Sequence, residues 1–214
     1  MAEDFLRIQN VSKLYAGVQA LDNVSMSIGQ GEVHCLVGEN GSGKSTLIKI
    51  IAGVVKPDGG EIVIQGKSYK NLRPIDSINE GIQVIYQDLS LFPNLSVAEN
   101  ISLNQLIEEK KKIINWKEVK NIASNVLLTI KKELDLKEKV ENISIANKQL
   151  VAICRALLRN AKLIIMDEPN SALNANESER LFDLLRRLRD QGITIIYVSH
   201  RLEEVFSISD RISV

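Results

Sequence analysis

A glycine-rich stretch constrains this chain more strongly than any other part of its sequence. It reads VGENGSGKST, covers residues 37–46, and precedes KSTLIKIIAGV, whose apolar spacing predicts a helix. The pattern GxxxxGK followed by Ser or Thr is filled by Gly38, Gly43, Lys44 and Ser45. A plain glycine turn before a helix is the alternative. At average composition the four fixed positions coincide in roughly one chain in a hundred of this length, so the match favours a nucleoside triphosphate site.

The chemistry of phosphate binding explains why this pattern uses glycines and one lysine. Without side chains in the way, successive backbone N–H groups turn toward one phosphate chain, and the start of the helix adds partial positive charge. Lys44 is placed to reach the outer phosphates, and Ser45 is placed to bind Mg²⁺. The residues that we expect to contact the nucleotide here are Gly38, Asn40, Gly41, Ser42, Gly43, Lys44, Ser45 and Thr46.

Two acidic residues end an apolar segment in the second half of the chain. The sequence LIIMDEP predicts a buried strand over residues 163–167, and Pro169 ends it. Asp167 stands where a magnesium-associated carboxylate belongs in a parallel sheet, and Glu168 is placed to orient or deprotonate an attacking water. Solvent-facing acids at a strand end are common, so alone the two interpretations are even. Because the chain also contains a phosphate loop, the interpretation of Asp167 and Glu168 as functional residues is favoured.

Four further residues stand in or at the ends of predicted strands. Gln87 follows the apolar GIQVIY, where a hinge residue can sense Mg²⁺ or water and relay this to the next segment. Tyr15 precedes the strand that feeds the loop, and its ring is placed to stack on a purine, although a half-buried strand tyrosine fits equally well. His200 ends the apolar IIYVS, where packing or capping is the commoner role. We interpret His34, inside the strand before the loop, as a packing residue.

The overall composition excludes several classes of protein. The chain of 214 residues carries 27 basic and 27 acidic side chains, so no global field favours nucleic acid, an acidic substrate or a membrane surface. Cys35 and Cys154 stand in apolar runs, which indicates reduced, buried thiols rather than a disulfide or metal framework. No apolar run approaches the roughly 18 residues of a membrane span, and the first residues lack a signal-peptide pattern. If this protein acts at a membrane, we expect it to bind there peripherally.

The order of the expected elements predicts an α/β fold. Short β-favourable segments before the loop predict an antiparallel part, and apolar strands alternating with helices from residue 145 onward predict a mainly parallel sheet covered on both faces. Between them we expect a helical subdomain, about residues 94–158, inserted in the α/β core of a single domain, residues 1–214. Because the chain stops at Val214 inside an apolar segment, we expect it to be cut from a longer protein. The apolar face of the insertion is predicted to comprise Trp116, Val119, Ile122, Ala123, Val126, Leu127 and Ile130.

In this order the motifs resemble the ATP-binding subunit of ABC transporters, over about residues 6–214. Tyr15 corresponds to the adenine-stacking loop, residues 38–46 to Walker A, Gln87 to the Q-loop, Ser144 to the signature, residues 163–168 to Walker B with its catalytic glutamate, residues 171–174 to the D-loop and His200 to the switch histidine. A finer resemblance, through LSLFPNLSVAENI, ISIANKQLVAICRAL and TIIYVSHRLEEVFSISDRISV, is to the ATPases of monosaccharide importers. Those polypeptides usually contain two such domains in tandem.

The resemblance implies a P-loop NTPase fold of the ABC ATPase type, in which two domains sandwich ATP. Each site combines the phosphate loop of one domain with the signature of the other. Ser144 would then cap its own helix and, with the N–H groups after it, hold the γ-phosphate of the partner's ATP. The general signature LSGGQ is replaced here at residues 143–147, where Asn147 takes the place of Gln, and Asn174 stands where many relatives have Asp. These differences bear on the rate of hydrolysis, and not on nucleotide binding.

The same resemblance assigns roles in hydrolysis. Lys44 and Mg²⁺ would stabilise the transferring phosphoryl group, Glu168 would act as the base, and His200 would contact the γ-phosphate. We expect Gln87 to act both as a catalytic residue and as a ligand of Mg²⁺. The residues expected to bind Mg²⁺ are Ser45, Gln87 and Asp167.

The implied function is ATP hydrolysis that powers the import of a small solute, with a monosaccharide as the finer expectation. The expected partners are membrane permease subunits, a second ATPase domain and, indirectly, a periplasmic or extracellular solute-binding protein. We expect the chain to lie peripherally on the cytoplasmic face of the membrane.

A soluble ABC-type ATPase acting on ribosomes or DNA is the alternative, but only a short lysine cluster, residues 110–112, would be available to bind nucleic acid. A GTPase is disfavoured because the NK at residues 147–148 lacks the acid of NKxD. A nucleotide sensor without hydrolysis is disfavoured by the presence of Glu168 and His200.

Overall fold

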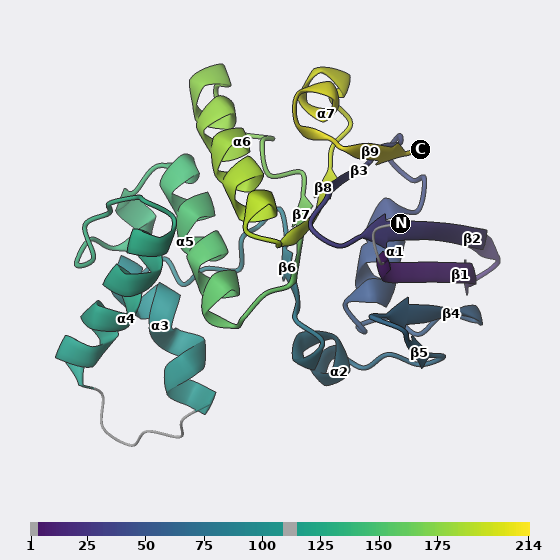
Figure 1. The fold of residues 1–214 in the computed structure, drawn as a ribbon, viewed down its shortest axis with the longest axis horizontal. Coiled ribbons are helices and arrows are strands. Elements are labelled where there is room, and N and C mark those ends of the chain that lie inside the picture. Colours follow the sequence, from purple (N-terminus) through teal and green to yellow (C-terminus); the bar gives the residue numbers. More distant parts are fainter. Residues whose placement is uncertain (1–3, 109–114) are drawn as a thin grey trace.

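The computed structural model describes residues 4–108 and 115–214, and Figure 1 shows how its elements are arranged. An antiparallel sheet of order β2-β1-β4-β5 lies beside a sheet of order β6-β7-β8-β3-β9, whose strands all run parallel. The antiparallel sheet consists of β1 (Asp4–Tyr15), β2 (Val18–Gly29), β4 (Gly59–Ile64) and β5 (Lys67–Tyr69). The parallel sheet consists of β3 (Val33–Leu36), β6 (Ile82–Ile85), β7 (Leu163–Asp167), β8 (Thr194–Val198) and β9 (Arg211–Ser213). The predicted fold class is confirmed.

Helices cover both faces of the parallel sheet, as the uniformly apolar strands predicted. They are α1 (Lys44–Ile51), α2 (Pro74–Asn79), α3 (Val97–Glu108), α4 (Trp116–Thr129), α5 (Ile145–Leu158), α6 (Ala175–Asp190) and α7 (Leu202–Ile208), with a short 3-10 turn, η1 (Val140–Asn142). Strand β7 illustrates the two-sided burial: Leu163 and Ile165 pack with α1 and the antiparallel sheet, whereas Ile164 and Met166 pack with the helices of the opposite face. A period of two sends alternate side chains to opposite faces of a strand. Shifting β7 by one residue would therefore exchange the contents of the two cores.

Helix α1 is held between the two sheets, and this fixes the place of the glycine-rich loop. Ile48 and Ile51 are buried in the same cluster as Phe5 of β1 and Ile62 of β4. Full burial of an aliphatic side chain contributes about 1.5–3 kcal/mol. The first residue of α1, Lys44, consequently has a fixed position at the carboxyl edge of the parallel sheet.

The segment predicted as a helical insertion contains α3, α4 and α5, which lie together on one side of the molecule in Figure 1. Of the predicted apolar face of α4, Val119, Ala123, Val126, Leu127 and Ile130 are buried. Trp116 is 54% exposed, so its assignment to this face was wrong: it is the first residue of α4 and lies one turn outside the packed segment. The lysine cluster at residues 110–112 lies outside the described residues. Within the described ranges, none of the helices is long and apolar enough to cross a membrane.

Two elements were not predicted from the sequence. Helix α2 has only six residues and starts at Pro74, where the Asp76 carboxylate accepts hydrogen bonds from the Arg73 backbone N–H, at 3.2 Å, and from the Arg73 guanidinium, at 2.7 and 2.8 Å. Strand β5 has only three residues. Elements this short carry too few residues to display a hydrophobic period.

The histidine and the cysteines of the interior have the packing roles that the sequence predicted. Cys35 and Cys154 are buried free thiols, and burial raises the pKa of each to about 12. His34 is 1% exposed, with Nδ1 3.0 Å from Glu32 Oε1 and Nε2 2.8 Å from Ser213 Oγ. Burial lowers the pKa of His34 more than the hydrogen bond to the Glu32 carboxylate raises it.

Candidate functional site

A cavity of about 480 Å³ opens at the carboxyl edge of the parallel sheet, between the glycine-rich loop and the ends of β6 and β7. Open α/β sheets bind their ligands at this edge. Most of the residues predicted to bind nucleotide and Mg²⁺ meet here although they come from distant parts of the sequence. The lining residues are Val18, Gln19, Ala20, Asn40, Gly41, Gly43, Lys44, Ser45, Thr46, Gln87, Asp167 and Glu168.

The loop owes its shape to Gly43, the residue immediately before α1. Its φ of +93° lies in the left-handed region, which L side chains rarely adopt. A Cβ atom there would lie 2.4 Å from the Ala20 carbonyl oxygen and 2.8 Å from Leu21 Cδ2. Because glycine has no side chain to cap the helix, the first N–H groups of α1 face the loop without a cap from this residue. The helix start is thereby suited to an anion.

Lys44 brings a positive charge to the same place. Its Nζ donates hydrogen bonds to the carbonyl oxygens of Gly38, at 2.6 Å, and Glu39, at 2.8 Å. An ammonium group has three donors, so these two bonds hold the charge over the loop and leave a third donor for an anionic ligand. Ser42 belongs to the same loop, whereas Thr46 is the third residue of α1. A Cβ atom on Gly38 would lie 2.5 Å from the Oγ of Ser42, so the Ser42 side chain fills the space beside this glycine.

Two carboxylates face this charge from the end of β7. Burial raises the pKa of Asp167, and the charge of the neighbouring Glu168 adds to this, while Lys44 and Lys49 lower it. Glu168 has a φ of +48°, a conformation that costs a residue with a side chain about 1–2 kcal/mol. The backbone is held there by a hydrogen bond of 3.0 Å from the Glu168 N–H to the Val198 carbonyl oxygen.

His200 and Glu168 form a direct pair. His200 Nδ1 lies 3.0 Å from Glu168 Oε1, although the residues are 32 positions apart in the sequence. The histidine side chain is 54% exposed and that of the glutamate 20% exposed. The contact fixes the direction of one carboxylate oxygen and leaves the other ring nitrogen of His200 available to a ligand.

The donor set around the loop fits a single Mg²⁺ ion. Ser45, Gln87 and Asp167 line the same cavity and offer a hydroxyl, an amide and one carboxylate. Mg²⁺ commonly takes one or two carboxylates and completes its shell with phosphate oxygens and water, so a cluster of acids is not needed. In the part of the chain that the structure describes, no group of three or more His, Cys, Asp or Glu residues is arranged to hold a metal.

Tyr15 lies at the rim of the site rather than in its lining. It is the last residue of β1, is 41% exposed, and pairs with Val18 of β2, which does line the cavity. The ammonium of Lys13 lies 5.4 Å from the centre of the Tyr15 ring. Sequence reasoning missed the contribution of residues 18–20, because only the hairpin pairing of β1 with β2 brings them to the loop.

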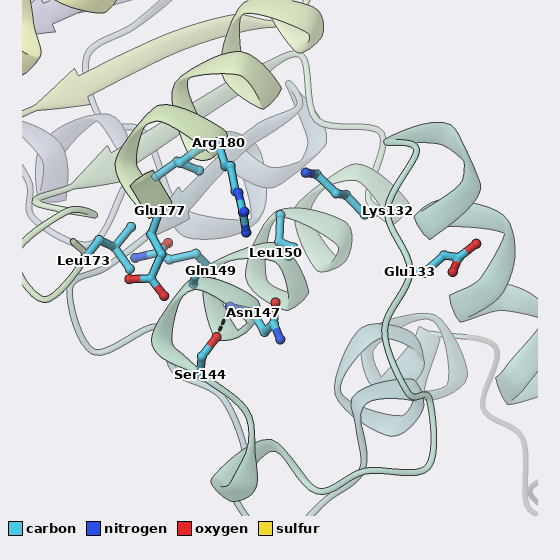
Figure 2. A pocket seen from close by; sticks show the side chains of 11 residues that line it. Lys132, Glu133, Ser144, Asn147, Gln149, Leu150, Leu173, Glu177 and Arg180 are labelled. Carbon is cyan, nitrogen blue, oxygen red and sulfur yellow. Dashed lines mark hydrogen bonds between the residues drawn. The ribbon is translucent and has the colours of Figure 1, made fainter. Parts of the chain in front are cut away.

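Ser144 lies away from the phosphate loop, on a second cavity of about 330 Å³. Figure 2 shows its hydroxyl accepting a hydrogen bond from the Asn147 backbone N–H, at 3.2 Å, so the predicted capping role is confirmed. Within one chain, therefore, Ser144 does not join the residues around Lys44. The residues around it on the second cavity include Lys132, Gln149, Leu173, Glu177 and Arg180.

Asn174 occupies a similar capping position at the start of α6. Its Oδ1 accepts from the Glu177 N–H at 3.0 Å, while Glu177 Oε2 accepts from the Asn174 N–H at 3.1 Å. The asparagine therefore satisfies the helix start in the manner of a capping box.

Curated sugar-import proteins share much of this sequence. It is 44% identical to the ribose import ATP-binding protein RbsA 2 of Escherichia coli O157:H7, over 98% of this chain and 41% of that protein. It is also 44% identical to the arabinose import ATP-binding protein AraG of Chromohalobacter salexigens, over 100% of this chain and 43% of that protein. The chain thus spans about two fifths of the length of the curated relatives that it matches.

Solved structures and a family description agree with these relatives. The fold superposes with a TM-score of 0.85 on MJ1267, an ATP-binding cassette of an ABC transporter in its ADP conformation, at 31% identity, covering 98% of this chain and 86% of that one. The dimeric structure of MJ0796, a bacterial ABC transporter cassette, gives a TM-score of 0.80 at 30% identity, covering 97% and 92%. Residues 21–171 match the family described as ABC transporter. The chain, matched over more than half of its length, belongs to the ABC transporter family.

Proposed function

We propose that this chain is the ATP-binding and ATP-hydrolysing domain of an importer for a small solute, with a monosaccharide as the solute class. The observation that carries the proposal is the single cavity in which the phosphate loop, Gln87, Asp167 and Glu168 converge. The names of the relatives, which are ATP-binding proteins for ribose and arabinose import, support the solute class. The relatives are more than twice as long as the chain, which supports the proposal that residues 1–214 are one domain of a tandem protein.

The residues of the cavity suit binding of the triphosphate. The start of α1 and the Lys44 ammonium supply positive charge, and the glycines keep the backbone close to the phosphates. Ser45, Gln87 and Asp167 are the residues that would hold Mg²⁺, which supplies neutralisation of the charge that develops on the phosphate oxygens. Tyr15 at the rim is proposed to stack on the adenine.

Hydrolysis needs a base near the γ-phosphate, and Glu168 is the proposed base. In an in-line attack, one proton of the water moves to the Glu168 carboxylate as the oxygen bonds to phosphorus and the bond to ADP breaks. The pairing with His200 at 3.0 Å orients this carboxylate. His200 is itself proposed to contact the γ-phosphate through its other ring nitrogen.

The site is proposed to be completed by a second domain. Ser144 lies outside the nucleotide cavity of its own chain, at an exposed helix start. Its oxygen and the N–H groups after it suit the γ-phosphate of ATP bound to a partner. Asn147, in place of Gln, leaves the cap intact, because its backbone N–H is the donor to Ser144. We therefore expect the altered signature to change the rate of hydrolysis more than the affinity for ATP.

The proposed partners are permease subunits that contact the surface around Gln87 and the helical insertion. Phe92, which follows Gln87 and precedes α3, is 47% exposed there. A peripheral position on the cytoplasmic face of the membrane and an indirect dependence on a solute-binding protein belong to the same proposal.

Affinity purification of the full-length protein from its membranes, followed by reconstitution into vesicles, tests this function. We expect permease subunits to co-purify and ATP to drive uptake of a monosaccharide into the vesicles. Co-purification with ribosomes or DNA, with no permease subunit and no ATP-driven uptake, would contradict the proposal and favour a soluble ABC-type ATPase.

A further inference from the structure

A buried hydrogen bond links the signature helix α5 to the loop that follows the proposed base. Gln149 is 3% exposed, and its Nε2 donates to the Pro169 carbonyl oxygen at 2.9 Å. Pro169 is itself buried and comes directly after Glu168. Figure 2 shows Gln149 extending from α5 on the side of Leu173 and Glu177, with which it lines the second cavity.

The loop after β7 needs such a contact, because its backbone is strained. The φ of +48° at Glu168 persists only where the surroundings determine the conformation. The 3.0 Å bond to Val198 holds the N-terminal side of Glu168, and the Gln149 bond holds the carbonyl of the next residue. Asn170 is 1% exposed, yet its amide nitrogen and oxygen make no hydrogen bond with the described residues. Gln149 therefore supplies a side-chain hydrogen bond between this loop and α5.

Helix α5 also begins at the exposed N-cap residue Ser144. Ser144 precedes Gln149 by five residues, a separation of about 7.5 Å along an α-helix, or about 1.4 turns. Over so short a distance a helix moves as a rigid body. A displacement of the helix start at Ser144 would therefore also move Gln149, which donates to the Pro169 carbonyl oxygen next to Glu168.

We propose that Gln149 is a positioning residue, which sets the direction of the Glu168 carboxylate through Pro169 and couples it to the signature helix of the same chain. This inference rests on the proposed function, in which Glu168 is the base and Ser144 contacts the partner's ATP. The Gln149 bond then provides a route by which ATP bound to the partner, at Ser144, affects the orientation of Glu168 in the first chain's own nucleotide site. Because the bond does not touch the nucleotide, its removal lowers turnover and leaves ATP binding unchanged.

The test compares variants of the full-length protein assembled with its permease. Gln149→Met keeps the length of the side chain and removes the donor. Val151→Ala is the matched control, since Val151 is also fully buried in α5 but lies two residues away, on the opposite face of the helix. For each variant, kcat and KM for ATP are measured together with Tm.

We expect Gln149→Met to have a kcat at least fivefold below that of Val151→Ala, with KM for ATP within twofold of the wild-type value. A smaller difference in kcat, or a rise in KM that accounts for the loss, would overturn the positioning role. If Gln149→Met does not fold, Gln149→Leu, which also removes the donor, takes its place under the same criteria. Glu168→Gln distinguishes failure of the proposed function from failure of the positioning role. Unchanged turnover in Glu168→Gln would refute the proposed base. An inactive Glu168→Gln together with a fully active Gln149→Met would refute only the positioning role of Gln149.

Discussion

Substitution of Gly43 by alanine separates the two reasons why the phosphate loop needs glycine. Gly43 and Gly41 share nearly the same conformation, with φ of +93° and +90°. They differ in their surroundings: a Cβ at Gly43 would meet the Ala20 carbonyl oxygen at 2.4 Å, whereas a Cβ at Gly41 has no atom within 4 Å among the described residues. Gly41→Ala is therefore a matched control for the conformational cost alone.

The magnitudes follow from these two terms. A left-handed conformation costs alanine about 1–2 kcal/mol relative to glycine, and both variants carry this cost. The close approach to Ala20 adds the cost of an over-packed contact, about 1–3 kcal/mol, at Gly43 only. For a chain of this size roughly 2–4 °C of Tm corresponds to 1 kcal/mol. Gly43→Ala should therefore melt roughly 2–12 °C below Gly41→Ala.

Thermal unfolding followed by circular dichroism measures the difference, and titration with ATP measures its consequence for binding. Gly192→Ala supplies a second control, because Gly192 has a φ of +90° and equally open surroundings but does not line the nucleotide cavity. It should lose stability as Gly41→Ala does and bind ATP with unchanged affinity. Equal Tm values for Gly43→Ala and Gly41→Ala would refute the argument that the contact with Ala20 requires glycine.

Two further predictions concern Tyr15 and His34. Stacking on adenine contributes about 1–3 kcal/mol, so Tyr15→Ala should bind ATP roughly 5- to 150-fold more weakly, while Tyr15→Phe should bind as the wild type does; equal affinities of Tyr15→Ala and the wild type in equilibrium titrations would remove the stacking role. Burial lowers the pKa of His34 below its ordinary 6.5, so below that pH the unfolded state binds more protons than the folded one, and stability is lost as the pH falls. Tm measured from pH 8 to pH 5 should fall more steeply for the wild type than for His34→Gln, and identical slopes would contradict this assignment.

The parts of the site that were predicted from the sequence are those that lie within one contiguous segment or at a strand end. Gly43 and Lys44 occur at a fixed spacing in one loop, and Asp167 follows one apolar strand. The uniform apolar character of β7 and β8 was enough to predict a parallel sheet, and such a sheet brings the ends of its strands to one edge.

Contacts that depend on packing were not predictable in this way. The bond from Gln149 to Pro169 requires α5 to lie against the loop after β7, and the pair of Glu168 with His200 requires β7 and β8 to be neighbours in register. A periodic apolar pattern also does not reveal where a helix extends beyond its neighbours, which is why Trp116 was wrongly assigned to the apolar face of α4.

We propose that Glu168 is the base of an ATPase site built on the phosphate loop. The most direct test is ATP turnover by the assembled transporter carrying Glu168→Gln, measured beside ATP binding by the same preparation. A general base contributes about 10²- to 10⁴-fold to the rate, so we predict a loss of turnover of at least tenfold with ATP affinity within twofold of the wild-type value. Wild-type turnover in the Glu168→Gln protein would contradict the account.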